Sequence, residues 1–313
     1  MKSKKLLIIG GSGFFAKSIL NYILNYNLFK NVKTVLLLSR GFNKIIIDKN
    51  LKKKIKIKII RADISRLKKI PFADYVIYCA INHNYNQDYK AVCNYYNLAK
   101  KYHLKSKILF TSSGAVYGLQ PKNTKKINED YLENNKRINF NDKNKNNLSV
   151  TKLKNENKFK RLSKFGIKVS IARCFTFVGR HLPRDSNFVV GNFIENILNR
   201  NKIEIKSDYR VIRSYMHEYD LVNWLYIILK NANIKCPIYN VGSDQAIEIR
   251  KLGFYLANKY KLGMRLKKIQ SNFKDIYIPS ISKAKKELKL NLKYNNFNAV
   301  DEVISHIRNN YSK

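Results

Sequence analysis

The stretch Leu6-Leu7-Ile8-Ile9-Gly10-Gly11-Ser12-Gly13-Phe14-Phe15-Ala16 decides the fold of this chain. It opens on an apolar run typical of a buried strand, which stops at Gly10, short of the roughly 7–15 apolar residues of a signal peptide. A glycine-rich turn follows, and then a segment, Ala16–Asn25, whose apolar residues recur at helical spacing. The sequence therefore predicts a strand, a tight turn and a helix in that order.

The same alternation continues through the first half of the chain. Apolar runs predict strands at Leu6–Ile9, Thr34–Leu38, Ile55–Ile60, Tyr75–Ala80, Lys107–Thr111 and Lys168–Ala172. Helical spacing recurs at Ala16–Asn25, Tyr89–Tyr102 and Lys152–Lys164. Strands that alternate with helices imply right-handed βαβ units and a parallel sheet covered on both faces. We therefore predict an α/β fold, with a Rossmann-type doubly wound parallel sheet in a first domain over residues 1–175.

Beyond Cys174 the regular alternation of predicted strands and helices ends. It predicts helices at Asn192–Asn199, Asp220–Lys230 and Ile249–Leu262, and strands at Lys202–Ile205 and Pro237–Val241. Such a region cannot build a parallel-sheet domain of its own. We predict that residues 176–313 form a smaller, mixed α/β lobe interleaved with the first domain, and that Pro121–Asn147 is a long polar loop with some helix.

The charge of the chain is extreme. The 313 residues include 62 Lys and Arg against 21 Asp and Glu, a formal net charge of +41. A nucleic-acid binder usually gathers its cations on one face or in a tail. Here they are dispersed and accompanied by many Ile and Asn residues, which favours compositional drift. A preference for anionic ligands or membrane surfaces is the alternative. We expect no specific nucleic-acid partner.

Composition excludes further classes. With 45% apolar and 12% aromatic residues, the chain is not a disordered basic tail. No run approaches the roughly 18 apolar residues of a membrane span, so no membrane insertion is expected. The four cysteines lie far apart, without Cys-x-x-Cys or Cys/His spacing, which predicts a reduced, cytoplasmic protein without a bound metal.

The glycine-rich turn predicts a dinucleotide site. Gly10 permits the tight turn, Gly13 lets the backbone approach a phosphate, and Ala16 allows close helix packing. The N–H groups at the helix start, from Phe14 onward, then bind a pyrophosphate with help from the helix dipole.

The ends of the following strands refine this prediction. Where NAD-binding folds carry an acidic residue, this chain has Ser39 and Arg40, which suit a 2′-phosphate and favour NADP over NAD; the alternative is an ordinary exposed Arg. Asp63 and Ile64 are predicted to contact the adenine, although Asp63 could instead cap a helix. Ala80, the last residue of the fourth predicted strand, is predicted to contact the cofactor.

These residues resemble the extended short-chain dehydrogenase/reductase family, the NAD(P)-dependent nucleotide-sugar epimerases and dehydratases. The matching segments run in order over almost the whole chain. They are Gly10–Phe14, Arg61–Ile64, Asp74–Ala80, Thr111–Gly118, Ile127–Asp130, Arg213–Asp220 and Tyr239–Ser243.

The resemblance implies a catalytic Ser/Thr, a Tyr and a Lys four residues after the Tyr. In that family the Tyr transfers a proton at the sugar hydroxyl, the Lys lowers its pKa and holds the nicotinamide ribose, and the Ser/Thr bonds the reacting oxygen. Ser113 and Lys152 fall on two of these positions, but the Tyr position is Leu148, which cannot titrate.

Three explanations of Leu148 stay open. The chain could bind without catalysing, or the motif alignment could be slipped, although no Tyr precedes a Lys by four residues between Tyr131 and Phe159. Another group could instead supply the proton transfer. Four candidates follow from predicted proximity: Lys152, Tyr117, Cys79 and His83.

Other residues bear on the reaction and the substrate. The resemblance implies that Arg213, and with less support Asn192, bind the nucleotide diphosphate, Asn192 having a capping role as the alternative. Thr176 stands where many members have Asn. Gly114-Ala115 replaces the Asp-Glu pair of common 4,6-dehydratases, which disfavours that reaction. His103, His181 and His306 are expected to be exposed, and His217 to make a structural hydrogen bond.

The resemblance as a whole implies an NAD(P)-dependent epimerase/dehydratase that acts on a nucleotide-activated sugar in surface polysaccharide biosynthesis, and a cytoplasmic homodimer. Two alternatives are a nucleotide-sugar 4-keto reductase and a catalytically degenerate protein that binds a dinucleotide and a sugar nucleotide.

Overall fold

The computed structural model describes residues 3–25, 29–41, 49–184 and 188–311. The chain forms two compact units, each assembled from several stretches. The first comprises Met1–Gly118, Asn139–Cys174 and Val222–Tyr239, and the second comprises Leu119–Ile138, Phe175–Leu221 and Asn240–Lys313. The chain therefore leaves and re-enters the first unit twice.

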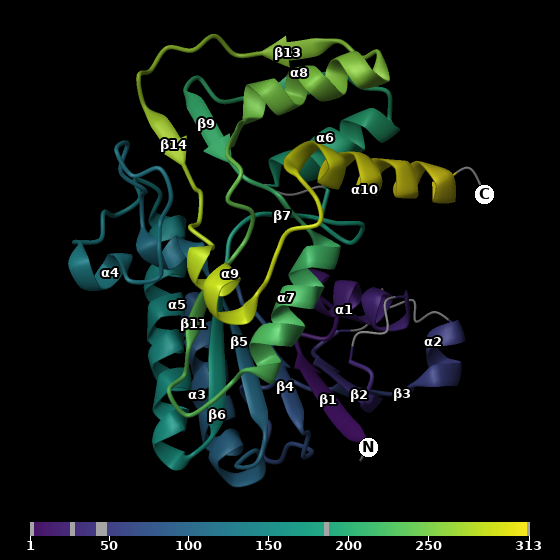
Figure 1. Ribbon diagram of the computed structural model, residues 1–313, viewed down its shortest axis with the longest axis vertical. Helices are drawn as coiled ribbons and strands as arrows, with labels where there is room; N and C mark the ends of the chain where they lie inside the picture. Colours follow the sequence, from purple (N-terminus) through teal and green to yellow (C-terminus); the bar gives the residue numbers. More distant parts are fainter. Residues whose placement is uncertain (1–2, 26–28, 42–48, 185–187, 312–313) are drawn as a thin grey trace. The chain divides into compact units, whose positions relative to one another are not determined.

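The first unit is built on a seven-stranded sheet in the order β11-β6-β5-β4-β1-β2-β3. The strands are β1 (Lys4–Ile9), β2 (Val32–Ser39), β3 (Lys56–Arg61), β4 (Tyr75–Tyr78), β5 (Lys107–Ser113), β6 (Lys168–Cys174) and β11 (Ile238–Val241). Neighbours from β3 to β6 pair in parallel, which confirms the predicted fold and all six predicted strands. The strand order reverses between β1 and β4, the switch point of a Rossmann sheet (Figure 1).

Helices cover this sheet. They are α1 (Phe14–Asn25), α2 (Lys49–Lys54), α3 (Tyr85–Tyr102), α5 (Lys143–Leu162) and most of α7 (Glu218–Lys230), with short 3₁₀ turns η1 (Gly114–Tyr117) and η2 (Ser163–Phe165). α5 begins nine residues before the predicted Lys152, because Asp142 caps it by accepting the Lys145 N–H at 2.9 Å. Because the first turns of α5 are polar, hydrophobic periodicity in the sequence did not reveal where this helix begins.

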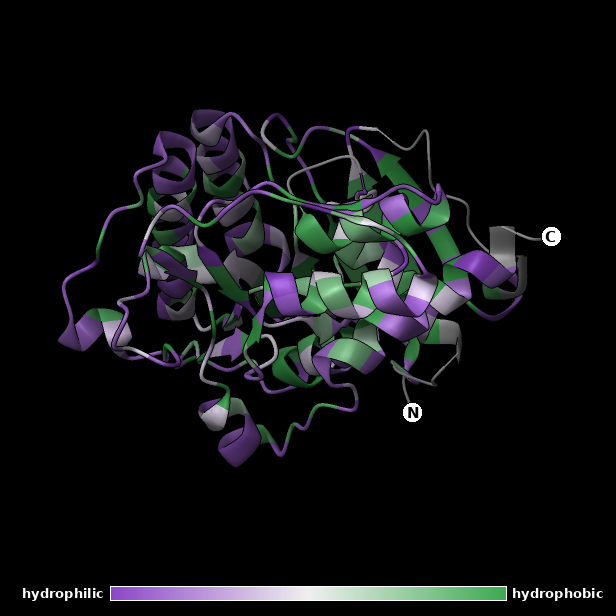
Figure 2. Ribbon diagram, turned by 90° about the horizontal axis from the view of Figure 1, so that it is seen from above, coloured by the Kyte–Doolittle hydropathy of each residue, from purple (hydrophilic) through white to green (hydrophobic). Residues whose placement is uncertain are grey.

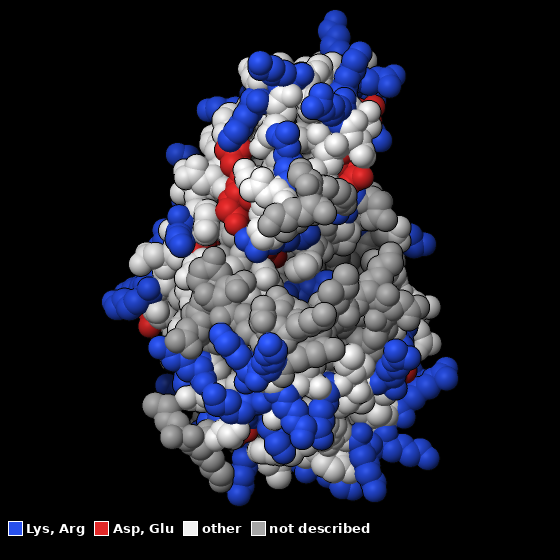
Figure 3. All heavy atoms as spheres, turned by 90° about the vertical axis from the view of Figure 1, so that its right-hand side faces the viewer, with Lys and Arg blue, Asp and Glu red and all other residues white. Residues whose placement is uncertain are grey.

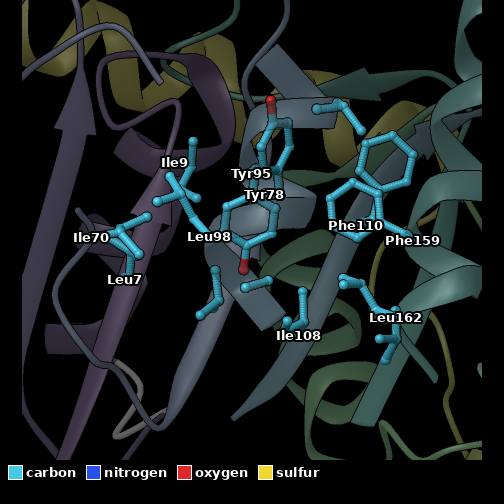
Figure 4. Close-up of a cluster of buried hydrophobic side chains, with 14 of the residues drawn as sticks. Leu7, Ile9, Ile70, Tyr78, Tyr95, Leu98, Ile108, Phe110, Phe159 and Leu162 are labelled. Carbon is cyan, nitrogen blue, oxygen red and sulfur yellow. The ribbon is translucent and has the colours of Figure 1, made fainter. Parts of the chain in front are cut away.

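Aromatic side chains hold α3 and α5 against one face of the sheet (Figure 4). The Phe110 ring on β5 stacks on that of Phe159 on α5, with centroids 4.3 Å apart. Tyr78 on β4 and Tyr95 on α3 complete the cluster at centroid distances of 5.2–5.8 Å from each other and from Phe159. This packing fixes α5 against β5 and α3.

The second unit has short strands and longer helices. Its helices are α4 (Tyr131–Asn134), α6 (Val189–Leu198), α8 (Ile249–Tyr260), α9 (Ser282–Leu288) and α10 (Asn296–Tyr311). Its strands are β7 (Phe177–Val178), β8 (Ile203–Ile205), β9 (Arg210–Arg213), β10 (Met216–His217), β12 (Ile247–Glu248), β13 (Met264–Leu266) and β14 (Lys274–Ile276). α6, α8 and α10 turn apolar faces into one core, and Figure 2 shows the two-sided character of such helices.

The positive charge is uneven between the units. The stretches of the first unit contain 35 Lys and Arg against six Asp and Glu, whereas those of the second contain 27 against 15. Figure 3 shows a face on which cations far outnumber acids. Within the described ranges, no helix is long and apolar enough to cross a membrane, and no three His, Cys, Asp or Glu side chains are grouped to hold a metal ion.

Substitution of Phe159 tests the aromatic cluster. Phe159→Ala removes one of the two stacked rings and leaves a cavity in the cluster. It is expected to lower the free energy of unfolding by about 3–5 kcal/mol. Phe165→Ala is the matched control, because the Phe165 side chain is 48% exposed, and it is expected to change stability by less than about 1 kcal/mol. Urea unfolding of both variants gives the comparison; equal losses would contradict it.

Candidate functional site

A pocket lies at the switch point of the sheet. Gly10 follows β1 with φ +100°, and a Cβ on it would lie 2.7 Å from the backbone N of Ala80, just after β4. Only glycine lets the two strand ends approach this closely without strain. Gly10 and Ala80 both line the pocket, so this approach shapes its floor.

The first turn of α1 forms one wall. Gly13 is exposed and lines the pocket, and its N–H donates to the Gly10 carbonyl at 3.0 Å. The first turn of α1 carries no Asp or Glu, so the helix has no carboxylate of its own at the positive end of its dipole. Phe14, the first residue of α1, is half-buried and does not line the pocket. This wall suits an anion such as a pyrophosphate.

The ends of β2 and β3 form the opposite wall. Ser39 shares a hydrogen bond of 2.8 Å with Ser12, and the exposed Arg40 lies next to it. Ile64 is buried in the core. Asp63 accepts the Ser65 N–H at 2.8 Å, so it fixes the local turn. Partial burial raises the pKa of Asp63, but Ser65 and the Arg40 and Arg66 guanidinium groups outweigh it and lower that pKa.

Seven residues predicted to bind a cofactor therefore meet in one pocket. They are Gly10, Gly13, Ser39, Arg40, Asp63, Ile64 and Ala80. The glycine at positive φ, the acid-free helix end and the polar wall at the end of β2 fit a dinucleotide. Ser113 and Lys152 are not part of this pocket's lining.

Ser113 and Lys152 belong to the same unit, near the ends of the central strands. Ser113 ends β5 beside Cys174 on β6, and its Oγ accepts the Ala115 N–H at 3.1 Å. Lys152 on α5 is 5% exposed, with its Nζ 5.2 Å from the centroid of the Phe110 ring. Burial lowers the pKa of Lys152, and the neighbouring Asp88, Cys174, Cys79 and Glu156 partly oppose this.

Leu148 lies one helical turn before Lys152. α5 runs without a break through both residues, so the two side chains share one face of the helix. Leu148 is half-buried, and α5 contains no Tyr. This helix therefore offers no phenol in the register of Lys152.

Tyr117, one candidate for the proton transfer that a Tyr at position 148 would perform, is hydrogen-bonded within the core. Its hydroxyl accepts a hydrogen bond of 2.9 Å from Arg173 Nη1, and its side chain is fully buried. Arg173 in turn binds both oxygens of Glu156, at 3.1 and 2.9 Å, and Ser112 donates to Glu156 at 2.6 Å. Tyr117 is thus part of a buried scaffold that joins η1, β5, β6 and α5.

The other two candidates differ in exposure. Burial raises the pKa of the Cys79 thiol to about 12, although Lys152 opposes it, so the thiol is protonated at neutral pH. His83 is exposed and does not line the pocket. Lys152 remains: burial lowers the pKa of its amine, which favours the neutral form that can accept a proton.

Two predicted substrate residues lie in the second unit. Arg213 on β9 donates to the Asp275 carboxylate and carbonyl, each at 2.7 Å, so its guanidinium already has an anionic partner. Asn192 is exposed within α6, whose N-cap is Phe188; Asn192 therefore does not cap this helix. Thr176 bonds the Ser214 carbonyl.

The histidines differ from one another in burial, and two of them differ from the prediction. His103 was expected to be exposed, which is wrong: it is buried, with ring nitrogens 3.2 Å from the Tyr95 hydroxyl and 3.1 Å from the Pro71 carbonyl, and burial lowers its pKa. His306 is half-buried rather than exposed, whereas His181 is exposed. His217 makes the expected structural bond, with Glu302 at 2.8 Å.

Sequence reasoning also missed Asp88, which lines the pocket at 3% exposure. Asp88 shares the buried face of α3 with Ala91, Val92 and Tyr95, at helical spacing. An acidic residue on an apolar helix face is the signal that could have found it.

The sequence matches the model of the NAD dependent epimerase/dehydratase family over residues 6–242, and the chain belongs to this family. No match was found among curated proteins.

Solved structures share the fold. UDP-glucose 4-epimerase from Thermotoga maritima, solved with UDP-glucose, is 17% identical with a TM-score of 0.78 over 98% of this chain and 99% of that one. dTDP-glucose 4,6-dehydratase from Bacillus anthracis, solved with NAD, is 14% identical with a TM-score of 0.80 over 99% and 98%. UDP-N-acetylglucosamine 4-epimerase from Methanobrevibacter ruminantium is 18% identical with a TM-score of 0.78 over 99% and 100%.

The Glu156–Arg173 scaffold gives a stability prediction. Glu156→Gln leaves Arg173 buried without its counter-charge and is expected to lower the free energy of unfolding by about 3–5 kcal/mol. Glu195→Gln is the control: it removes a carboxylate that is 44% exposed and 3.5 Å from Arg184, and should cost less than about 1 kcal/mol. Thermal or urea unfolding measures both; a Glu156 variant as stable as the control would refute the scaffold's role.

Proposed function

We propose that this chain binds NAD(P) in the switch-point pocket and acts on a nucleotide-activated sugar as an epimerase/dehydratase-type enzyme. The observation that carries the proposal is the glycine turn beside Ala80, in the same unit as Ser113 and the buried Lys152. Family membership supports it, as do the UDP-glucose and the NAD with which similar structures were solved.

The wall at the end of β2 favours NADP. Ser39 and Arg40 offer a hydroxyl and a guanidinium, which suit the two or three oxygens of a 2′-phosphate. A carboxylate at this place would instead hold the ribose hydroxyls of NAD.

Ser113 and Lys152 are the two residues that we assign to the reacting oxygen of the substrate. Ser113 Oγ would donate a hydrogen bond to the reacting oxygen, and Lys152 would bind the nicotinamide ribose and transfer the hydroxyl proton that a Tyr would otherwise take. The bound nicotinamide supplies the chemistry of accepting and returning a hydride. Burial lowers the pKa of Lys152, which favours the neutral amine that can accept this proton.

Gly114 and Ala115 limit the set of reactions that we propose. These residues, directly after Ser113, carry no acid or base for the departure of water. Epimerisation is therefore our first choice, followed by 4-keto reduction or an atypical dehydration.

A second candidate function is binding without turnover, which Leu148 favours. A panel of UDP-, GDP-, CDP- and dTDP-sugars, incubated with cofactor-loaded protein and followed by chromatography of the products, distinguishes the two. The enzyme proposal predicts turnover of at least one sugar nucleotide by the natural chain and its loss in Lys152→Met. Turnover only after Leu148→Tyr would support the binding protein and overturn the enzyme.

Arg40 provides a test of cofactor preference. Arg40→Ala should weaken NADP binding by about tenfold or more, because a charge-assisted bond to phosphate is lost, and leave NAD binding nearly unchanged. Arg66→Ala is the control, since Arg66 is exposed and does not line the pocket. Calorimetric titration gives both affinities; equal losses for NADP and NAD would count against the assignment.

Gly13 provides a test of the phosphate wall. A Cβ on Gly13 would meet only the Gly10 carbonyl, at 3.4 Å, so Gly13→Ala should fold. Its methyl group would stand where a phosphate approaches, and both dinucleotides should bind about tenfold or more weakly. Gly41→Ala, whose Cβ has no neighbour within 4 Å, is the matched control. Unchanged affinity in Gly13→Ala would place the phosphates elsewhere.

A further inference from the structure

A buried carboxylate on α3 lies in the pocket without a cation bonded to it. Asp88 is 3% exposed and lines the pocket. Its Oδ1 accepts the Asn82 backbone N–H at 2.7 Å, and its Oδ2 accepts the Asn155 side-chain amide at 2.9 Å. Both donors are neutral, and in the described part of the chain no Lys, Arg or His forms an ion pair with Asp88. The carboxylate is therefore fixed in place with its charge uncompensated by direct contact.

A buried amine on α5 is in the complementary position. Lys152 precedes Asn155 by three residues on the same helix, so Asn155 joins the Lys152 turn to Asp88. Among the described residues, Lys152 makes no hydrogen bond or ion pair. The Asn155 Oδ1 atom is also buried and has no hydrogen-bond partner there. A buried acid on α3 therefore acts electrostatically on a buried amine on α5, and Asn155, one turn after that amine, is hydrogen-bonded to the acid.

The other groups that face Lys152 do not supply a counter-charge. Cys79, directly after β4, is a partly buried thiol and Cys174 on β6 is a buried one, and burial raises the pKa of both. Glu156 on α5 is already bound by Arg173 through both oxygens. Asp88 is the remaining anion that acts on Lys152, and it raises the pKa that burial lowers.

We propose that Asp88 is a positioning residue whose carboxylate is the counter-charge for the ammonium group formed when Lys152 takes the substrate's hydroxyl proton. This rests on the proposed function. The proton would pass from the sugar hydroxyl to the Lys152 amine, and an oxidised dinucleotide, when bound, would accept the hydride from the same carbon, which would become a carbonyl. Asp88 exchanges no proton. With Leu148 in place no phenolate can carry the negative charge next to Lys152, and Asp88 supplies it from α3.

Asp88→Asn is the discriminating variant because it removes the charge and keeps the shape. The new amide can still accept from the Asn82 N–H. Its NH₂ group can donate to the Asn155 Oδ1 after an amide flip, which would satisfy an acceptor that now has no partner. The variant should therefore fold. Asp74→Asn is the matched control, because Asp74 is 28% exposed and pairs with Lys4 on the surface of the same unit.

The first readout is the protonation of Lys152 in the protein without cofactor or substrate. Competitive acetylation across pH, followed by mass spectrometry of the peptide that carries Lys152, gives its titration midpoint. Removal of the anion should lower this midpoint by about one pH unit or more in Asp88→Asn and leave it unchanged in Asp74→Asn. An unchanged midpoint in Asp88→Asn would overturn the proposal, whether or not the protein turns over any sugar nucleotide.

The second readout is the pH dependence of turnover with a sugar nucleotide identified by the panel. The alkaline-rising limb should move to lower pH in Asp88→Asn by the same amount as the midpoint, while the limiting rate falls about tenfold or more because the ammonium product loses its counter-charge. A fall in rate with the limb unmoved would mean a purely structural role and overturn the proposal. Absence of turnover in the natural chain, with the acetylation midpoint shifted, would instead refute the proposed function and leave the coupling between Asp88 and Lys152 established.

Discussion

The close approach of Gly10 to Ala80 is the constraint on which the rest of the first unit depends. β1 lies between β2 and β4, and the crossovers leave it in opposite directions, so a crevice opens at its carboxyl end. A side chain on Gly10 would collide with the backbone after β4. The glycine therefore sets both the junction of the sheet and the floor of the pocket, which six further residues predicted to bind a cofactor also line.

The first unit buries two groups of polar side chains. One part is a closed scaffold in which Glu156, Arg173, Tyr117 and Ser112 satisfy one another. The other part is open: Lys152 has no hydrogen-bond acceptor in the described protein, and Asp88 has no cationic partner. A network whose polar groups are all hydrogen-bonded stabilises the fold. A buried amine and a buried acid without an ion-pair partner cost folding free energy, and such groups are typical of functional sites. Catalysis by a chain with Leu148 becomes physically reasonable on this ground.

Much of the fold could be predicted from the sequence, because β1, β2 and β4 each carry a continuous apolar run. The glycine turn and the residues after β2, β3 and β4 were also within reach, since a parallel sheet gathers the carboxyl ends of its strands. The start of α5 was not, because its first turns are polar and depend on the Asp142 cap. His103 and Asp88 were missed for a related reason: their burial depends on partners distant in sequence, Pro71 and Asn155. The charge of +41, spread along the sequence, is concentrated in the unit that holds the pocket, where it can attract anionic ligands but selects none.

The central claim is that Lys152, not a tyrosine, takes the substrate proton in this protein. The most direct measurement is the single-turnover rate of nicotinamide reduction after a sugar nucleotide is mixed with the NAD(P)-loaded natural chain, followed by absorbance across pH. The account predicts a rate that rises with pH and whose midpoint coincides with the titration midpoint of Lys152 measured by acetylation. A rate that is independent of pH over this range, or a midpoint that differs from that of Lys152, would contradict it.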